Sequence, residues 1–156
     1  MARSLQELFI ESRGQPVQVG GVLVRQGDVL PITKGRVTIR FLRGQAKDHG
    51  VRLETKNGWI ELTDGSRAMV VDTWRSPEFP DEISYRVSCP QKDLDMWNIY
   101  RLFHTGGLVT EDMWTGGAGM VLLEGCPNRR VYGCSAGGSG EFAPDTLVVE
   151  VEWHEE

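Results

Sequence analysis

The chain of 156 residues has little cysteine, and this shortage excludes several classes of protein. Its three cysteines, Cys89, Cys126 and Cys134, are odd in number and include no Cys-x-x-Cys pair. A disulfide framework and a zinc ribbon are therefore not indicated, and we expect reduced, structural thiols. A bridge between Cys126 and Cys134 stays open as an alternative, if the segment between them folds back on itself.

Long hydrophobic runs are absent as well. No apolar stretch approaches the roughly 20 residues that a membrane-spanning helix needs. The first residues, MARSLQELFIESRGQ, carry acidic side chains where a signal peptide has its apolar stretch. The sequence therefore predicts a soluble, cytoplasmic protein without a membrane partner.

Positive charge is in deficit, because 17 Lys and Arg face 22 Asp and Glu, for a net charge of -5. This acidic balance argues against a nucleic-acid-binding domain. Residues 1–60 nevertheless carry a net charge of +5 and residues 61–156 a net charge of -10. We expect either two differently charged faces of one sandwich, or head-to-tail self-association or an anionic partner for the first part.

One group of basic residues recurs along the first part of the chain. Its members are Arg36, Arg40, Arg43, Lys47, Arg52 and Lys56. Charged residues protect the edges of sheets from pairing with other sheets, and we interpret this group in that way.

Glycine, in contrast, is abundant, with 19 residues, and it separates runs of strand-forming residues. The pattern is clearest in residues 51–74, where Asn57-Gly58 and Asp64-Gly65 divide three such runs. Asn-Gly predicts a tight type I′ hairpin, with Gly58 in the left-handed conformation. In this hairpin one face is apolar and consists of Val51, Leu53, Thr55, Ile60 and Leu62.

The remaining chain shows the same kind of pattern. Ser4 and Glu7 fit a capping box, which predicts a short amphipathic helix over about residues 5–12. Strands are expected at 17–25 (with a bulge at Gly20-Gly21), 35–43, 83–88, 120–124, 130–135 and 146–154. Residues 93–104 fit either a strand or a helix, and their aromatic content favours the strand. The sequence therefore predicts one all-β domain over residues 1–156, a two-sheet antiparallel sandwich (jelly-roll-like) or a barrel of about ten strands.

Residues 105–119 are expected to form a long glycine-rich loop, a feature that is uncommon unless it is functional. Trp114 lies in this loop, and Trp59 falls on the polar face of the predicted hairpin. Exposed aromatic side chains of this kind can stack on a sugar or on a partner protein. Trp97 and Trp153, in contrast, are assigned to the core.

Three patterns resemble catalytic or cofactor motifs but lack the required context. Gly133-Cys134-Ser135-Ala136-Gly137 matches the nucleophile elbow, but the glycine-rich residues that follow cannot begin a helix. The three histidines show no metal-binding spacing, although Glu150, Glu152 and His154 share one strand face. The glycine clusters at 116–119 and 137–140 lack the Lys-Ser/Thr and the helix of a phosphate loop.

These observations favour a non-enzymatic module that binds a protein or carbohydrate partner, and they leave a homo-oligomer open. The expected binding residues are Trp59, Trp114, Asp112 and His104, with no cofactor, metal or catalytic residue assigned. The alternative is a small cupin-like or hydrolase-type enzyme that uses His104, Asp112 and His49 in a cleft under residues 105–119.

Overall fold

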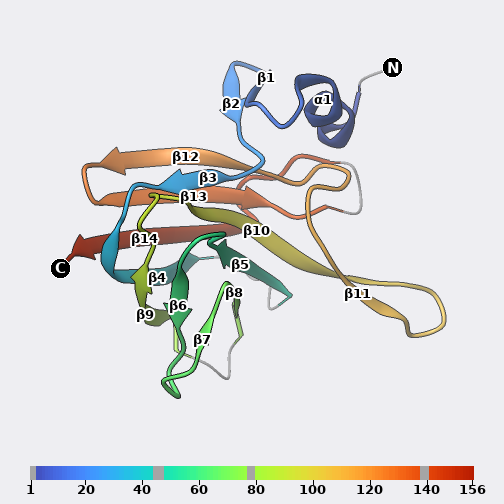
Figure 1. Cartoon of the computed structure of the whole chain (residues 1–156). Coiled ribbons are helices and arrows are strands. Elements are labelled where there is room, and N and C mark those ends of the chain that lie inside the picture. The colour runs from blue at the N-terminus through green and yellow to red at the C-terminus, as the bar shows by residue number, and fades with distance from the viewer. Residues whose placement is uncertain (1–2, 44–47, 77–79, 138–140) are drawn as a thin grey trace.

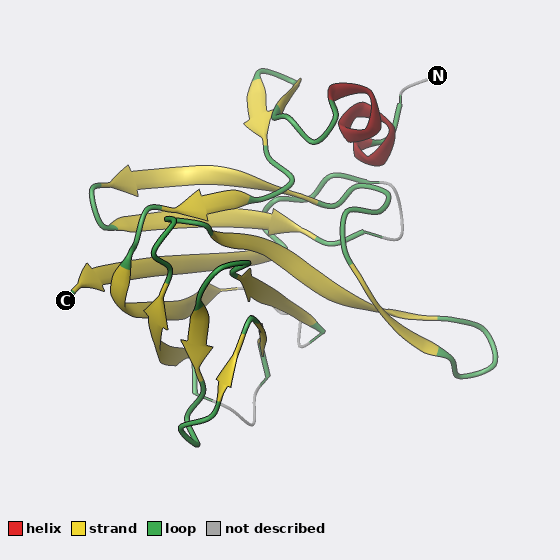
Figure 2. Cartoon of the chain, viewed as in Figure 1, coloured by secondary structure: helices red, strands yellow, loops and turns green. Residues whose placement is uncertain are grey.

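The structure is a computed structural model that describes residues 3–43, 48–76, 80–137 and 141–156. These residues form an all-β sandwich of two antiparallel sheets, with a separate two-stranded sheet and one short helix near the N-terminus (Figures 1 and 2). Within the described residues neither sheet closes on itself, so the sandwich alternative is confirmed and the barrel is not. Among the described residues, no helix is both long enough and apolar enough to cross a membrane.

The larger sheet contains seven strands. Their spatial order is β12 (Gly119–Cys126), β13 (Arg129–Ser135), β14 (Leu147–Glu155), β4 (Lys34–Arg43), β9 (Glu82–Ser88), β6 (Trp59–Glu61) and β7 (Arg67–Ala68). The smaller sheet has the order β11 (Val109–Asp112), β10 (Leu94–Phe103), β5 (His49–Glu54) and β8 (Val70–Trp74), and β3 (Asp28–Leu30) pairs with the first residues of β10. The described strands outnumber the ten expected because several are only two to four residues long.

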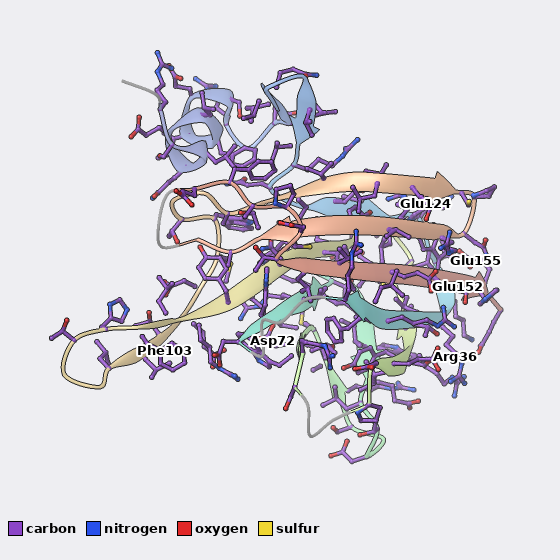
Figure 3. The ribbon with its side chains drawn as sticks, turned by 180° about the vertical axis from the view of Figure 1, so that it is seen from behind. Arg36, Asp72, Phe103, Glu124, Glu152 and Glu155 are labelled. Atoms are coloured by element: carbon purple, nitrogen blue, oxygen red, sulfur yellow. The ribbon has the colours of Figure 1, made fainter. Side chains whose placement is uncertain are left out.

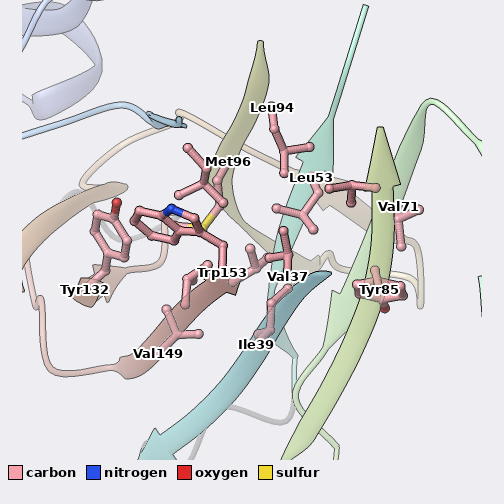
Figure 4. Packing of buried hydrophobic residues seen from close by; sticks show 14 of the residues in the cluster. Val37, Ile39, Leu53, Val71, Tyr85, Leu94, Met96, Tyr132, Val149 and Trp153 are labelled. Carbon is pink, nitrogen blue, oxygen red and sulfur yellow. The ribbon is translucent and has the colours of Figure 1, made fainter. Parts of the chain in front are cut away.

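The core lies between the two sheets, since each presents one apolar face to the other. In Figure 4 side chains from both sheets meet there, among them Leu53, Leu94 and Met96 from the smaller sheet and Val37, Val149 and Trp153 from the larger. The strand predicted at 93–104 is confirmed as β10. It is buried on both faces over much of its length, and apolar residues occur on both of them.

The helix α1 (Leu5–Ser12) begins where the capping residues predict. The Ser4 hydroxyl accepts a hydrogen bond from the backbone N–H of Glu7, and Arg13 ends the helix in the left-handed conformation. Leu5 and Phe9 are buried against Val24, so the apolar stripe packs on this chain's own hairpin. That hairpin lies beside the helix in Figure 1 and joins β1 (Val17–Val19) to β2 (Val22–Val24).

The bulge expected at Gly20-Gly21 is instead the turn of this β1–β2 hairpin. Both glycines have positive φ angles, 57° and 80°, and Val19 pairs with Val22 across them. Two successive positive φ angles are the requirement of a type I′ turn, which glycine meets without a steric cost. The prediction of a continuous strand over residues 17–25 was therefore wrong.

The prediction of a hairpin at Asn57-Gly58 was also wrong, because the chain crosses from one sheet to the other at this point. β5 pairs with β10 and β8 in the smaller sheet, whereas β6 pairs with β9 and β7 in the larger. Gly58 is not among the glycines with a positive φ, in contrast to Gly65, whose φ is 87° in the turn between β6 and β7. The predicted apolar face is nevertheless inside, because both sheets turn it toward the same core.

Replacing Gly58 with alanine should therefore destabilise the protein by steric contact rather than by a strained φ. A Cβ atom at this position would lie 1.9 Å from the carbonyl oxygen of Ser88, a backbone atom that cannot move freely. We expect Gly58→Ala to lower the free energy of unfolding by roughly 3 kcal/mol, the upper range for overpacking. Urea denaturation would measure it, with Gly106→Ala as control. Gly106 has a φ of 90° and open space around it, so about 1–2 kcal/mol is expected there.

The basic residues of β4 do not lie at a sheet edge, so that interpretation was wrong for this strand. This strand lies in the middle of the larger sheet, between β14 and β9. Arg40 bonds to Glu82, Glu150 and Glu152 on the two neighbouring strands. In the smaller sheet, Arg52 of β5 pairs with Asp72 of β8 through two hydrogen bonds. The basic first part and the acidic second part of the chain thus meet inside one molecule; Lys47 lies outside the described residues.

The cysteines are free thiols in this structure. The segment between Cys126 and Cys134 does fold back, as the β12–β13 hairpin, but the register pairs Cys126 with Arg129 and Cys134 with Met120. Five residues of extended strand therefore separate the two cysteines, or about 16 Å along the strand. This spacing excludes the Cys126–Cys134 disulfide.

Candidate functional site: a groove beside two tryptophans

Strand β10 places Asp95 and Trp97 on the outer face of the smaller sheet. Asp95 lies between Val29 of β3 and Glu54 of β5, its direct partners on either side. Trp97 is two residues further along the same face and is only 7% exposed. The outer face of a sheet does not normally bury a tryptophan, so something covers this one.

Trp114 provides that cover. Its ring centroid lies 5.1 Å from that of Trp97, with a tilt of 43°, and its indole N–H donates to the backbone oxygen of Gln26 at 3.1 Å. The indole N–H of Trp97 in turn points to the Met113 sulfur at 3.0 Å. Two tryptophans in tilted contact are therefore fixed by hydrogen bonds on the outer face of the smaller sheet.

The backbone at Trp114 has a positive φ of 60°, which is unusual for so large a side chain. The following residue, Thr115, holds this backbone conformation. Its backbone N–H donates to the Tyr100 hydroxyl at 2.9 Å, and the side-chain hydroxyls of Thr115 and Tyr100 also form a hydrogen bond. A bulky residue in this region costs about 1–3 kcal/mol and persists only where its surroundings impose it. Such strain is concentrated at functional sites and marks Trp114 as a candidate.

Next to the tryptophans is a groove of about 470 Å³. We call it the tryptophan groove, and it is lined by Gly14, Gln15, Pro16, Arg25, Gln26, Gly27, Asp28, Val29, Glu54, Lys56, Asp95, Met96, Trp97 and Trp114. It thus lies where the end of the helix, the beginning of β3 and the beginning of β10 come together. Its lining combines aromatic rings, two side-chain amides, carboxylates and two cations, which provide both donors and acceptors.

Two of its carboxylates are available to a ligand. Within the described part of the chain, Asp95 and Glu54 have no ion pair and no side-chain hydrogen bond. Burial raises the pKa of Asp95; the charge of Lys56 acts in the opposite direction, and those of Glu54 and Asp93 add to the increase. Asp28, in contrast, is occupied by Arg130 and Tyr132. A hydroxyl group that donates to Asp95 or Glu54 would satisfy acceptors that the protein itself leaves free.

The four residues predicted from the sequence fall in three separate places. Trp114 lines the groove, whereas Trp59 lies in the larger sheet, with the Arg67 guanidinium 3.8 Å above its ring. His104 and Asp112 do come together, on the hairpin of β10 and β11, where both bond to the Thr110 hydroxyl. The expected site is thus not a single surface.

The prediction of a long loop over residues 105–119 was wrong for the first half of this segment. Residues 109–112 form β11, which pairs with the end of β10. The hairpin projects from the body of the sandwich in Figure 1, and Figure 3 shows Phe103 on this arm. A turn joins its two strands, and only residues 113–118 form a loop, the one that carries Trp114.

The geometry gives little support to the enzyme alternative. His49 is fully buried between the sheets, and His104 is on the exposed arm. The Thr110 hydroxyl donates to Asp112 at 2.5 Å, so its proton is not directed to His104 as in a nucleophile activated by a histidine. No group of three metal-ligating side chains is found in the parts of the chain that the structure describes.

The first three residues of the Gly-x-Ser-x-Gly match, Gly133 to Ser135, end strand β13, and Ala136 and Gly137 follow outside the strand. Ser135 is the last residue of β13 and is fully buried, and its hydroxyl accepts a hydrogen bond from the Ala143 backbone N–H. Residues 138–140 of the following stretch lie outside the described part, and no helix occurs in residues 141–156. His154 lies near the other end of the neighbouring strand β14, opposite Arg36.

The sequence did not identify Trp97, Asp95, Glu54 and Gln26 as one site. The only local signal was the alternation in β10, where Asp95 and Trp97 follow each other on one face and Leu94 and Met96 on the other. Their neighbours come from segments about 40 to 70 residues earlier in the chain, which no local pattern reveals. No protein-family model, curated protein or solved structure matches the chain.

Proposed function

We propose that this protein is a non-enzymatic binding module that takes a carbohydrate in the tryptophan groove. The observation that supports the proposal is the combination of Trp114, held at a strained backbone, with the free carboxylates of Asp95 and Glu54 in one groove. Sugars present flat apolar faces to aromatic rings and hydroxyl groups to polar side chains, and this lining offers both. The binding requires no cofactor.

The groove is better suited to a neutral sugar than to a charged one. Arg25 and Lys56 contribute two positive charges to the lining, and Glu54 and Asp95 two negative charges, while Asp28 is paired with Arg130. A strongly anionic ligand would be repelled by the two carboxylates, and a strongly cationic ligand would be repelled by the two basic residues. A neutral ligand with several hydroxyl groups meets neither repulsion.

Replacing Trp114 with alanine should weaken carbohydrate binding at least tenfold. Aromatic residues at the centre of a binding site commonly contribute about 2 kcal/mol or more when truncated, and tenfold corresponds to about 1.4 kcal/mol. A glycan array would identify a ligand, and isothermal titration would then compare Trp114→Ala with Trp59→Ala. The Trp59 variant removes a tryptophan that stacks with an arginine in the other sheet, and its affinity should equal that of the unaltered protein.

Thermal denaturation of the same variants separates binding from packing. If Trp114→Ala lowers the Tm by several degrees and leaves the affinity unchanged, Trp114 only covers Trp97 and its binding role is contradicted. An unaltered protein that binds no glycan would contradict the carbohydrate proposal itself.

A protein partner is the second candidate, and the projecting arm favours it. Phe103, Leu108 and Val109 on the β10–β11 hairpin are 66%, 62% and 45% exposed. Apolar side chains grouped on a projecting hairpin are typical of surfaces that contact another chain. A homo-oligomer formed through this arm belongs to the same proposal.

A further inference from the structure

A second cavity lies on a different part of the sandwich from the tryptophan groove. It has a volume of about 670 Å³ and is bordered by β8 of the smaller sheet and β9 of the larger sheet. β8 is the edge strand of its sheet, so the cavity lies where the two layers face each other beside that edge. Pockets that hold small molecules commonly have volumes of about 300–1,000 Å³.

The wall of this cavity is largely apolar. Trp74, Pro80, Ile83 and Tyr85 are among its described lining residues. Trp74 is held in place by the Arg101 guanidinium, which lies 3.9 Å from the ring centroid. The preformed apolar wall would remove a hydrophobic ligand from water without first reorganising the protein.

Two hydroxyl groups of the cavity form a pair. The Thr73 and Tyr85 hydroxyls are 2.7 Å apart, a hydrogen bond between the two sheets, and Tyr85 is only 4% exposed. Burial raises the pKa of Tyr85, so its hydroxyl stays protonated and can donate. A ligand hydroxyl or carbonyl placed beside this pair would extend an existing hydrogen bond.

The charges around the cavity exclude most ionic ligands. Its described lining contains the carboxylates of Asp72 and Glu82 but no Lys, Arg or His. Asp72 is bonded to Arg52, and Glu82 to Arg40, so each negative charge already has a partner outside the lining. An anion would find no free cation in the lining, and a cation would have to compete with two arginines.

We propose that the cavity between β8 and β9 is a binding site for a small neutral apolar molecule that carries one hydrogen-bonding group, such as an aliphatic or aromatic alcohol. The site is independent of the tryptophan groove, because the two linings share no residue. Its occupant would lie against Trp74, Pro80 and Ile83, with the polar group directed to Thr73 and Tyr85.

The neutral fluorophore N-phenyl-1-naphthylamine tests this site by titration of the full chain. We expect saturable binding of one equivalent, and displacement by 1-decanol but not by decanoate, because only the alcohol is uncharged. Pro80→Trp and Thr63→Trp place a large side chain in the lining and should each weaken probe binding at least tenfold. Pro31→Trp is the matched control, since Pro31 is exposed and borders neither cavity, and its affinity should be unchanged.

Three results would overturn the proposal. The first is probe binding that is absent or not saturable. The second is equal affinity in Pro80→Trp, Thr63→Trp and Pro31→Trp, with circular dichroism showing that all three are folded. The third is loss of binding in Phe103→Ser or Trp114→Ala, which would place the probe on the projecting arm or in the tryptophan groove instead.

Discussion

Lowering the pH from 7 to 4 should cost the protein about 3 kcal/mol of stability through a single side chain, His49. Its imidazole is fully buried at the start of β5, and burial lowers its pKa from the ordinary 6.5 to about 4. The folded state therefore holds His49 neutral where the unfolded chain would protonate it. The contribution of the neutral His49 to the free energy of unfolding is complete above pH 6.5. It decreases as the pH falls and is lost at about pH 4. Each pKa unit corresponds to about 1.4 kcal/mol.

The hydrogen bonds around His49 explain why protonation of its imidazole is unfavourable in the folded state. The Asn98 side-chain amide donates to Ser135 O at 2.9 Å and has one further N–H for His49 Nε2, at 3.0 Å. His49 Nε2 is then the acceptor and Nδ1 carries the proton. Nδ1 itself has no hydrogen-bond partner among the described residues. Protonation would take the acceptor from Asn98 and place a positive charge in a site without a counterion.

Urea denaturation at pH 7, 6, 5 and 4 would measure this effect in the unaltered protein and in His49→Gln. The variant keeps a polar group but cannot titrate, so its stability should fall about 3 kcal/mol less between pH 7 and pH 4. Comparison of the two removes the contribution of the carboxylates, which both proteins share. Parallel profiles, or an imidazole that titrates near 6.5 by NMR in the folded protein, would contradict the prediction.

The sequence predicted most of the long strands and many of the buried residues, because these depend on local composition and alternation, but it missed the short strands β3 and β11. β4, β10 and β14 lie where they were expected, and Leu147, Val149, Val151 and Trp153 share the buried face. The pairing of strands was harder to predict, since it depends on contacts between distant segments. Asn57-Gly58 has the composition of a hairpin turn, but tertiary pairing carries β5 and β6 into different sheets.

The candidate site shows the same division between local and distant information. Trp114 was identified because a tryptophan in a glycine-rich segment is unusual on local grounds alone. Trp97 was assigned to the core; it is buried, but under Trp114 on the outer face of the sheet rather than between the two sheets. Glu54 and Asp95 become neighbours only through the register between β5 and β10. Nothing in the separate segments indicates that they border one groove.

Replacing Asp28 with alanine should cost about 3 kcal/mol, because this residue joins the two sheets beside the tryptophan groove. Asp28 is on β3 of the smaller sheet, and its Oδ2 accepts hydrogen bonds from the Tyr132 hydroxyl at 2.6 Å and from Arg130 at 3.1 Å, both on β13 of the larger sheet. Tyr132 is fully buried, and burial and the bond to Asp28 both raise its pKa. Alanine would leave a buried hydroxyl without its acceptor and an arginine without its counterion.

A double-mutant cycle with Tyr132→Phe separates the hydrogen bond from the general loss of Asp28. Tyr132→Phe alone should cost about 1 kcal/mol, and the double variant should be more stable than the two separate losses predict, by about 1 kcal/mol, because phenylalanine needs no acceptor. Asp28→Asn is the matched control, since it keeps an acceptor for Tyr132 and removes only the charge. Urea denaturation at pH 7 would give all four values. Strictly additive losses, or an Asp28→Ala variant within 0.5 kcal/mol of the unaltered protein, would show that this contact does not hold the sheets together.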